Sequence, residues 1–182
     1  MTVAARARSA SFRRMAVDIR PGAALLLAAA MLGAGPVRAA ALGDAQIRSF
    51  VGQQQRSWNA GDLDAYFAGF RPDARFTDQY RTPSGQVVPY GTSTLAQARI
   101  QSRKFRATSK VAERGEILRI AVSADGRSAE VVSQVTSQIQ GPKGARTTCA
   151  ERRQELVLEG AAVRSRGQTD TFSRCPRPRA RP

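Results

Sequence analysis

Apolar residues recur at helical spacing in the first half of the chain. Between Asp44 and Trp58 they form one stripe, which also includes a glutamine: Ile47, Phe50, Val51, Gln54 and Trp58. This spacing predicts an amphipathic helix, and Asp44 is a suitable N-terminal cap for it. Gly61 is expected to end the helix, because glycine readily takes the left-handed conformation at a helix C-terminus.

Two further helices are predicted, one on each side of a short strand. Asp62 can cap a helix that runs to about residue 69. Residues 74–80 are then expected to form a strand, which a loop containing proline and glycine follows. Thr92 or Ser93 can cap the third helix, which runs through about residue 105.

The second half of the chain is predicted to be a sheet. Residues 111–122 and 127–140 have the pattern of strands joined at Asp125-Gly126, a strong hairpin signal. Residues 145–159 and 163–172 follow as two more strands, with glycine in the turns before them. The whole order predicts an α+β fold, in which three N-terminal helices pack on a strongly curved antiparallel sheet and leave a pocket between the layers.

The first forty residues have the pattern of an export signal. A basic segment ends near Arg20, an apolar run covers residues 23–32, and small residues at Val37-Arg38-Ala39 and Ala39-Ala40-Ala41 offer two cleavage sites. The apolar run is short for a membrane span. We therefore expect a signal peptide over residues 1–40, one domain over residues 41–173 and a basic, proline-rich tail over residues 174–182. The protein is expected to be exported, either periplasmic or secreted, without a stable membrane anchor.

Charge and residue types narrow the function classes. The formal net charge is +15, and the six arginines and one aspartate of residues 1–39 account for +5 of it. The remaining arginines are scattered among acidic residues except in the tail, so we expect no nucleic-acid partner. The chain has no histidine, which excludes histidine catalysis and a histidine pH switch.

The two cysteines, Cys149 and Cys175, both lie after the predicted leader. An even number of cysteines in an exported chain predicts one disulfide, which would join the strands of the last hairpin. Two cysteines without histidine cannot complete a four-ligand zinc site. We expect no metal and no cofactor.

The segment Trp58-Asn59-Ala60-Gly61-Asp62-Leu63-Asp64 resembles the nuclear-transport-factor-2-like superfamily, which includes ketosteroid isomerase and the SnoaL-like cyclases. The similarity continues through Pro72-Asp73-Ala74-Arg75-Phe76-Thr77-Asp78 and Tyr90-Gly91, and it covers roughly residues 44–173. The resemblance implies a cone-shaped α+β fold. It does not imply one function, because many chemistries and non-catalytic roles share this cone.

The resemblance also implies a site. In the isomerase an aspartate in the strand after Pro-Asp-Ala acts as the general base, and this position matches Asp78. The two groups that donate hydrogen bonds to the developing enolate in the isomerase match Gln54 and Gln154 here. Glutamine amides are weaker, neutral donors, so steroid isomerisation does not carry over to this chain.

Strand alternation adds residues to this site. Asp78 is expected to point inward, on the same face as Phe76 and Ala74. If Cys149 faces Cys175, the register of the last hairpin places Asp170 opposite Gln154 and within diagonal reach of Arg152. The predicted site has two catalytic carboxylates and six ligand-binding side chains: Asp78 and Asp170; Gln54, Trp58, Tyr66, Tyr80, Arg152 and Gln154.

Structural roles compete with these assignments. Asp78 could be a solvated residue at a strand end, Arg152 and Asp170 a structural ion pair, and the aromatic side chains part of the core. Three functions stay open: an exported module that binds a small apolar or amphipathic molecule, an isomerase, cyclase or dehydratase that uses Asp78 as its base, and an interaction protein that uses the sheet face. The missing donors favour the binding module. A small-molecule ligand is the expected partner, and a homodimer stays open.

Overall fold

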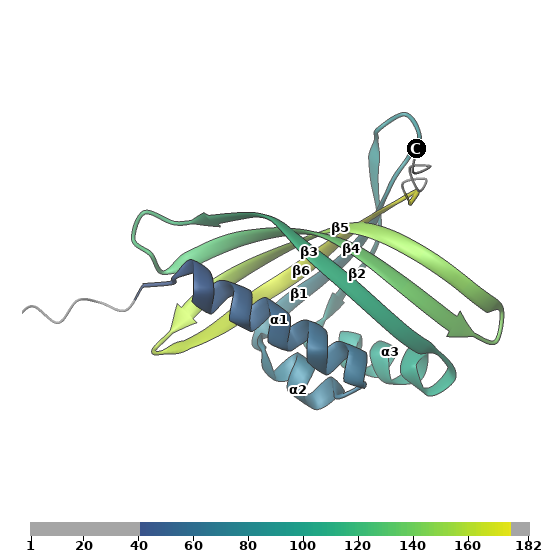
Figure 1. Cartoon of the computed structure of the whole chain (residues 1–182), viewed down its shortest axis with the longest axis horizontal. Helices are drawn as coiled ribbons and strands as arrows, with labels where there is room; N and C mark the ends of the chain where they lie inside the picture. Colours follow the sequence, from purple (N-terminus) through teal and green to yellow (C-terminus); the bar gives the residue numbers. More distant parts are fainter. Residues whose placement is uncertain (1–40, 176–182) are drawn as a thin grey trace, which may run out of the picture. The chain divides into compact units, whose positions relative to one another are not determined.

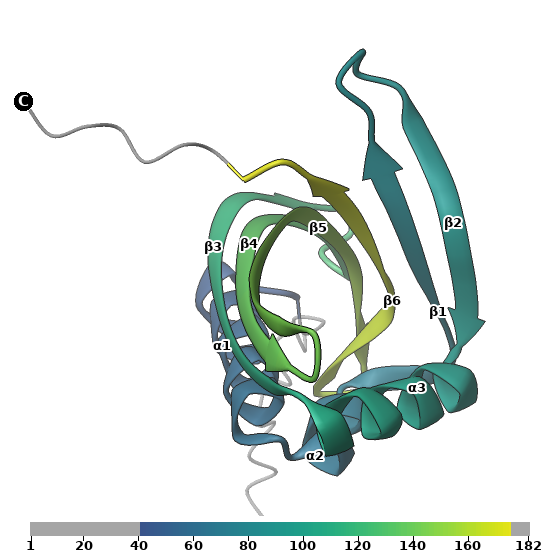
Figure 2. The same cartoon turned by 90° about the vertical axis from the view of Figure 1, so that its right-hand side faces the viewer.

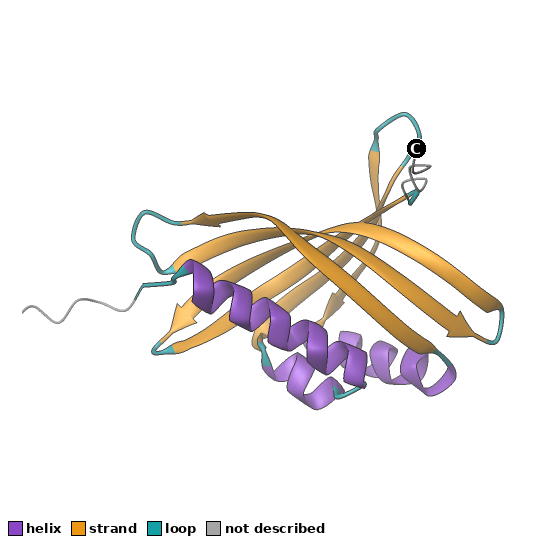
Figure 3. Ribbon diagram, viewed as in Figure 1, coloured by secondary structure: helices purple, strands orange, loops and turns teal. Residues whose placement is uncertain are grey.

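A computed structural model describes residues 41–175, which form three helices and a six-stranded sheet (Figures 1 and 3). The elements are α1 (Asp44–Ala60), α2 (Leu63–Ala68), β1 (Phe70–Arg81), β2 (Val87–Thr94), α3 (Leu95–Thr108), β3 (Lys110–Val122), β4 (Ser128–Gly141), β5 (Gly144–Glu159) and β6 (Ala162–Ser173). The predicted leader lies outside the described residues, as does the predicted tail beyond its first two residues. None of the described helices has the length and apolarity needed to cross a membrane.

The sheet has the strand order β2-β1-β6-β5-β4-β3, and it is curved and unclosed (Figure 2). Neighbouring strands are antiparallel except β1 and β6, which are parallel. All three helices lie on one side of the sheet, as the two views in Figures 1 and 2 show. The α+β prediction is confirmed, and the expectation of a purely antiparallel sheet is wrong at one pair of strands.

The predicted loop after the early strand is partly a strand, β2. Pro89, which argued for a loop, pairs with Gln79 inside this strand. Proline cannot donate a backbone hydrogen bond to a neighbouring strand, but β2 lies at the edge of the sheet and has a neighbour on one side only. The third helix consequently follows two strands instead of one.

The helix caps differ in detail from the predictions. Asp62 caps α2 as expected, with its carboxylate accepting a hydrogen bond from the Ala65 backbone N–H at 3.0 Å. The cap of α3 is Thr94, which forms a capping box with Gln97. The cap of α1 is Gly43, which offers no side chain, and Asp44 instead forms an ion pair with Arg48 on the helix surface.

Two clusters of buried side chains join the helices to the sheet. The first joins α1 to the central strands: Leu42, Ile47, Ala129, Val131, Leu156 and Leu158. The second joins α2 and α3 to β1: Tyr66, Phe67, Phe70, Ala74 and Ala98. We call the face of the sheet that meets the helices the inner face. Residues 150, 152, 154, 156 and 158 of β5 were predicted to share one face, and all but one of these side chains are buried, Arg152 being partly exposed.

The register of the last hairpin differs from the predicted one by two residues. Glu159 pairs with Ala162 across a two-residue turn, and a bulge between Glu155 and Leu156 shifts the pairing by one residue. Arg152 therefore lies directly opposite Asp170, and Gln154 opposite Gln168. Cys149 pairs with Ser173, yet the predicted disulfide to Cys175 is present, with a Cα–Cα distance of 5.1 Å.

Candidate functional site

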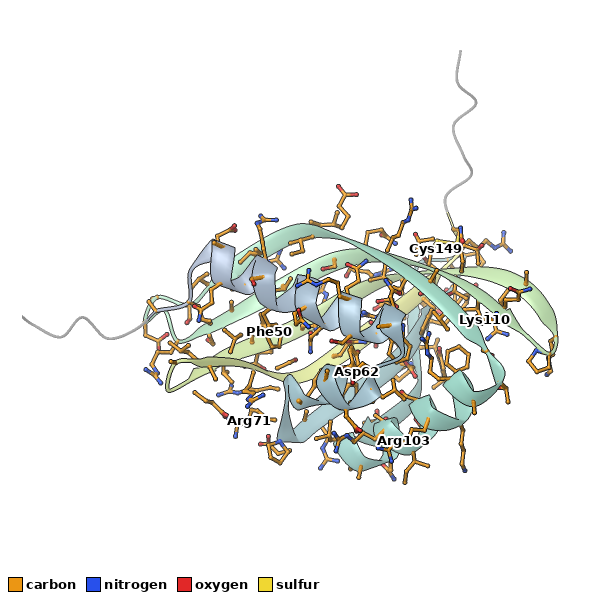
Figure 4. All side chains as sticks on the ribbon, turned by 60° about the horizontal axis from the view of Figure 1, so that its bottom comes forward. Phe50, Asp62, Arg71, Arg103, Lys110 and Cys149 are labelled. Atoms are coloured by element: carbon orange, nitrogen blue, oxygen red, sulfur yellow. A yellow bond between two sulfur atoms is a disulfide. The ribbon has the colours of Figure 1, made fainter. Side chains whose placement is uncertain are left out.

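A cavity of about 720 Å³ opens at the end of the sheet where the disulfide lies. Figure 4 marks this end by Cys149 and Lys110, away from Phe50, which packs against the first buried cluster. The cavity walls are mainly apolar and come from α1, α3 and the inner face: Trp58, Phe105, Val111, Val135, Ile139, Ala150 and Phe172, with Tyr80 and Tyr90 from the β1–β2 hairpin. Its volume falls in the range typical of small-molecule sites, roughly 300–1,000 Å³.

The polar part of the cavity wall is a cluster of three charged side chains. Arg152 of β5 lies between Glu113 of β3 and Asp170 of β6. Its Nη1 and Nη2 donate to the Glu113 carboxylate at 2.7 and 3.3 Å. Its Nε and Nη2 donate to the Asp170 carboxylate at 2.8 and 3.0 Å. These four bonds use four of the five guanidinium N–H groups, so Arg152 is held in one orientation.

The two carboxylates compensate the buried cation. Burial alone would lower the pKa of Arg152, but the charges of Asp170 and Glu113 outweigh burial and raise this pKa well above its ordinary value. Glu113 also accepts a hydrogen bond from the Ser137 hydroxyl at 3.2 Å, and Asp170 accepts one from the Gln168 amide at 3.0 Å. The cluster carries a formal charge of −1 and is satisfied largely from within.

The end of α1 fixes the position of Glu113. The Asn59 side chain donates to the Glu113 carbonyl at 2.8 Å and accepts from the Glu113 N–H at 2.7 Å. Gln55 donates to the same carbonyl at 3.0 Å. The Asn59 amide therefore joins the end of α1 to the strand that carries one of the three charged residues.

The predicted glutamines lie behind the charged cluster and do not line the large cavity. Gln154 donates to the Gln54 carbonyl at 2.8 Å, and both side chains border a separate void of about 20 Å³. Tyr66 borders the same void and donates to Gln168 at 3.2 Å. Burial raises the pKa of Tyr66 far above its usual range. Tyr66 and Gln154 thus donate to protein partners, whereas the Gln54 amide nitrogen is buried without a hydrogen-bond partner. None of the three side chains lines the large cavity.

Asp78 lies beside the cluster without joining it. It pairs with Asp170 across the parallel strands and shares a face with Ala74, which is buried. The side chain of Asp78 is nevertheless exposed, so the prediction that it points away from solvent is wrong. The reason is its place on β1, where the strand runs on toward the β1–β2 hairpin and no helix covers it. Partial desolvation, and then the charge of Asp170, raise the pKa of Asp78, while Arg152 lowers it.

The structure therefore brings four of the eight predicted site residues to the cavity: Trp58, Tyr80, Arg152 and Asp170. The most important residue that the sequence interpretation missed is Glu113. Val111 and Glu113 lie two positions apart on a strand, so alternation alone puts this carboxylate on the apolar face. A carboxylate there needs a cationic partner, and this signal could have identified it.

Trp58 belongs to both the core and the cavity wall. The Trp58 and Tyr66 rings lie 5.1 Å apart, and the Arg106 guanidinium lies over Trp58 at 5.6 Å from the ring centroid. Trp58 thus forms a boundary, with Tyr66 and the second buried cluster on one side and the cavity on the other. Within residues 41–175 no group of three or more Cys, Asp or Glu side chains is arranged to hold a metal ion.

Comparison with known proteins gives similarity in structure and not in sequence. No protein-family model matches the chain, and no curated protein matches it significantly. Among solved structures, a ketosteroid isomerase-like protein from Erwinia carotovora atroseptica has a TM-score of 0.56 at 12% identity, over 70% of this chain and 94% of that one. The beta subunit of benzoate 1,2-dioxygenase from Burkholderia mallei has a TM-score of 0.55 at 14% identity, over 74% and 93%.

A third similar structure holds a small molecule. It is a protein from Catenulispora acidiphila in complex with S-DNPA, with a TM-score of 0.51 at 15% identity, over 70% of this chain and 91% of that one. At such identities the similarity concerns the fold alone. The described part of the chain has the nuclear-transport-factor-2-like fold, which it shares with ketosteroid isomerase-like proteins.

Proposed function

We propose that this protein is an exported module that binds a small apolar or amphipathic molecule in the cavity between sheet and helices. One observation carries the proposal: the cavity has a mainly apolar wall and one polar cluster whose charges are already paired. Apolar walls favour binding by the area they remove from water, and a few fixed polar groups orient the ligand.

The same geometry supports binding more than catalysis. An oxyanion-stabilising site needs donors aimed at the reacting atom, but Gln54 and Gln154 bond to each other and lie outside the cavity. Arg152 donates four hydrogen bonds to Glu113 and Asp170. Arg152 is therefore largely committed to its two carboxylates, and the Gln54 amide nitrogen, which is buried without a hydrogen-bond partner, does not line the cavity.

The proposal is tested by filling the cavity. N-phenyl-1-naphthylamine, a neutral apolar dye, should bind the parent protein, with its fluorescence rising to saturation. Ala150 is buried in the cavity wall, so Ala150→Phe should weaken dye binding at least tenfold. Ala162→Phe makes the same change at an exposed position at the start of β6 and should leave binding as it is. Equal binding by all three proteins would refute the cavity as the site.

Export is the second part of the proposal. It rests on the predicted signal peptide over residues 1–40, and the disulfide of Cys149 with Cys175 is compatible with an oxidising compartment. N-terminal sequencing of the protein from the medium or the periplasm should find a start between Ala39 and Ala41. A start before Ala23, or a protein that stays in the cytoplasm, would contradict export.

Proton transfer by Asp78 is the alternative function. The raised pKa of Asp78 and its place beside Asp170 favour it, because a carboxylate with a raised pKa is a better base. If the protein is such an enzyme, Asp78→Asn should lower kcat strongly and leave substrate binding nearly unchanged. Turnover that survives this change would remove Asp78 from the chemistry.

A further inference from the structure

The cavity has a cationic mouth in addition to its apolar wall and charged cluster. Arg146 of β5 and Arg174, one residue past β6, both line it, and both are exposed. Neither forms an ion pair with any acidic side chain among residues 41–175, although eight other described arginines do: Arg48, Arg71, Arg99, Arg103, Arg119, Arg152, Arg153 and Arg166. The mouth therefore has two cations whose charges are uncompensated by described side chains.

The two cations line the same space, and strand alternation accounts for Arg146. Arg146, Thr148, Ala150 and Arg152 occupy alternate positions of β5 and so share the inner face. Arg146 pairs with Ile139, which pairs with Val111, and all three line the cavity. Arg174 follows Phe172 by two residues and lines the cavity beside it.

The cavity therefore changes in polarity along its length. Arg146 and Arg152 are six residues apart on one strand, which corresponds to about 20 Å along an extended chain. Between them the wall includes the apolar side chains of Val135, Ala150 and Phe172, together with Ser137 and Thr148. The cluster at the inner end has a formal charge of −1, from Glu113 and Asp170 against Arg152, so an anion is disfavoured there and favoured at the mouth.

We infer that the ligand is an amphiphile with an anionic head group, a carboxylate, sulfate or phosphate, held between Arg146 and Arg174 at the mouth. Its apolar body lies along the wall toward Arg152, and its far end is apolar or carries an uncharged polar group. This inference rests on the proposed binding function and adds the chemical class and the orientation of the ligand.

The test compares three twelve-carbon probes that differ in head group: dodecanoate, dodecanol and dodecyltrimethylammonium. Each displaces N-phenyl-1-naphthylamine from the full chain, below the concentration at which the probe forms micelles. Dodecanoate should bind about three- to tenfold more tightly than dodecanol, because each exposed ion pair raises the affinity by less than about tenfold. The ammonium probe should bind most weakly. The preference for dodecanoate should shrink in 0.5 M salt, as screening of exposed charges requires.

Variants locate the preference. Arg146→Gln with Arg174→Gln should lower the affinity for dodecanoate to that for dodecanol. Arg153→Gln removes an arginine that faces away from the cavity, next to Arg152 in sequence, and should keep the full preference. Binding of all three probes with equal affinity, or tightest binding of the ammonium probe, overturns the head-group inference and leaves the cavity proposal standing. Failure of the neutral dye itself to bind overturns both.

Discussion

Arg152 is the side chain on which the interior of the cavity depends most. It is the only cation that Glu113 and Asp170 share within the described residues, and it makes four hydrogen bonds to them. A buried ion pair gains little over an apolar replacement of the whole group, but removal of one partner leaves a charge buried without compensation. Replacement of one residue of the cluster should therefore destabilise the protein by more than the net contribution of the whole cluster to stability.

Arg152→Met should lower the free energy of unfolding by about 3–5 kcal/mol, because it leaves two buried carboxylates without their cation. The matched control is Arg153→Met on the opposite face of β5, where the pair with Glu151 is largely exposed. The control should cost about 1 kcal/mol or less. Urea unfolding at neutral pH measures both. Equal losses for the two variants would mean that the cluster is not buried in solution.

Asp78→Asn should change stability in a pH-dependent way. A carboxyl whose pKa is raised in the folded state binds protons more readily there than in the unfolded chain. The folded state therefore loses stability as the pH rises above 3.8, the ordinary pKa of this carboxyl. Asparagine removes this penalty. The variant should therefore be more stable than the parent at pH 7, with the difference disappearing near pH 3.

Asp125→Asn is the control of opposite sign. The hydrogen bond from Ser123 lowers the pKa of Asp125. Loss of the Asp125 carboxylate should therefore destabilise the protein at pH 7 and have a smaller effect at low pH. Unfolding curves at the two pH values check both variants. A destabilising effect of Asp78→Asn at pH 7 would mean that Asp78 gains more from Arg152 than it loses beside Asp170.

At the scale of elements, the β5–β6 hairpin holds most of the site. It carries Arg152, Asp170, Ala150 and Phe172, and the disulfide closes its open end at Cys149 and Cys175. The bond spans 26 residues, which predicts a contribution of about 3 kcal/mol, mainly through the unfolded chain. It also tethers the end of β6 next to the cavity mouth.

Reduction of the disulfide should therefore lower stability by about 3 kcal/mol in urea unfolding with and without reductant. The double variant Cys149→Ala with Cys175→Ala should show a similar loss and no response to reductant. Thiol titration of the denatured, unreduced parent should find no free thiol. Two free thiols would contradict the bond between β5 and the residue after β6.

The order of elements could be predicted from sequence for the parts in which one local signal decides the structure. The apolar stripe of α1, the Asp62 cap of α2 and the Asp125-Gly126 hairpin all act over a few residues, and each appears in the structure. The parallel contact of β1 with β6 joins residues about ninety positions apart, and no local pattern encodes it. The same holds for β2, since its edge position is what makes Pro89 acceptable.

The site was predictable only in part for a related reason. Alternation identified Arg152 and Asp170, but their direct pairing depends on a bulge between Glu155 and Leu156 that shifts the register. The glutamines of the resemblance, Gln54 and Gln154, were expected to bind the ligand, but Gln154 donates to Gln54 and neither side chain lines the cavity. Exposure of Asp78 depends on which helices cover β1, which the sequence of the strand does not encode.

At the scale of the whole molecule, the two buried clusters and the cavity occupy different parts of the inner face. The two buried clusters join the helices to the sheet at one end and along β1, while the inner face at the other end lines the cavity. This division agrees with a fold that serves many functions through the lining of one cavity.

The central claim is that a ligand occupies this cavity, and the most direct measurement is the set of nuclear Overhauser effects between a bound neutral dye and the methyl groups of the protein. With N-phenyl-1-naphthylamine on the methyl-labelled chain, contacts are predicted to Val111, Val135, Ile139 and Ala150, which line the cavity from four positions on three strands. Ala162, at the exposed start of β6, should show none. Contacts confined to the apolar run of residues 23–32, or to methyl groups outside the cavity wall, would contradict the account.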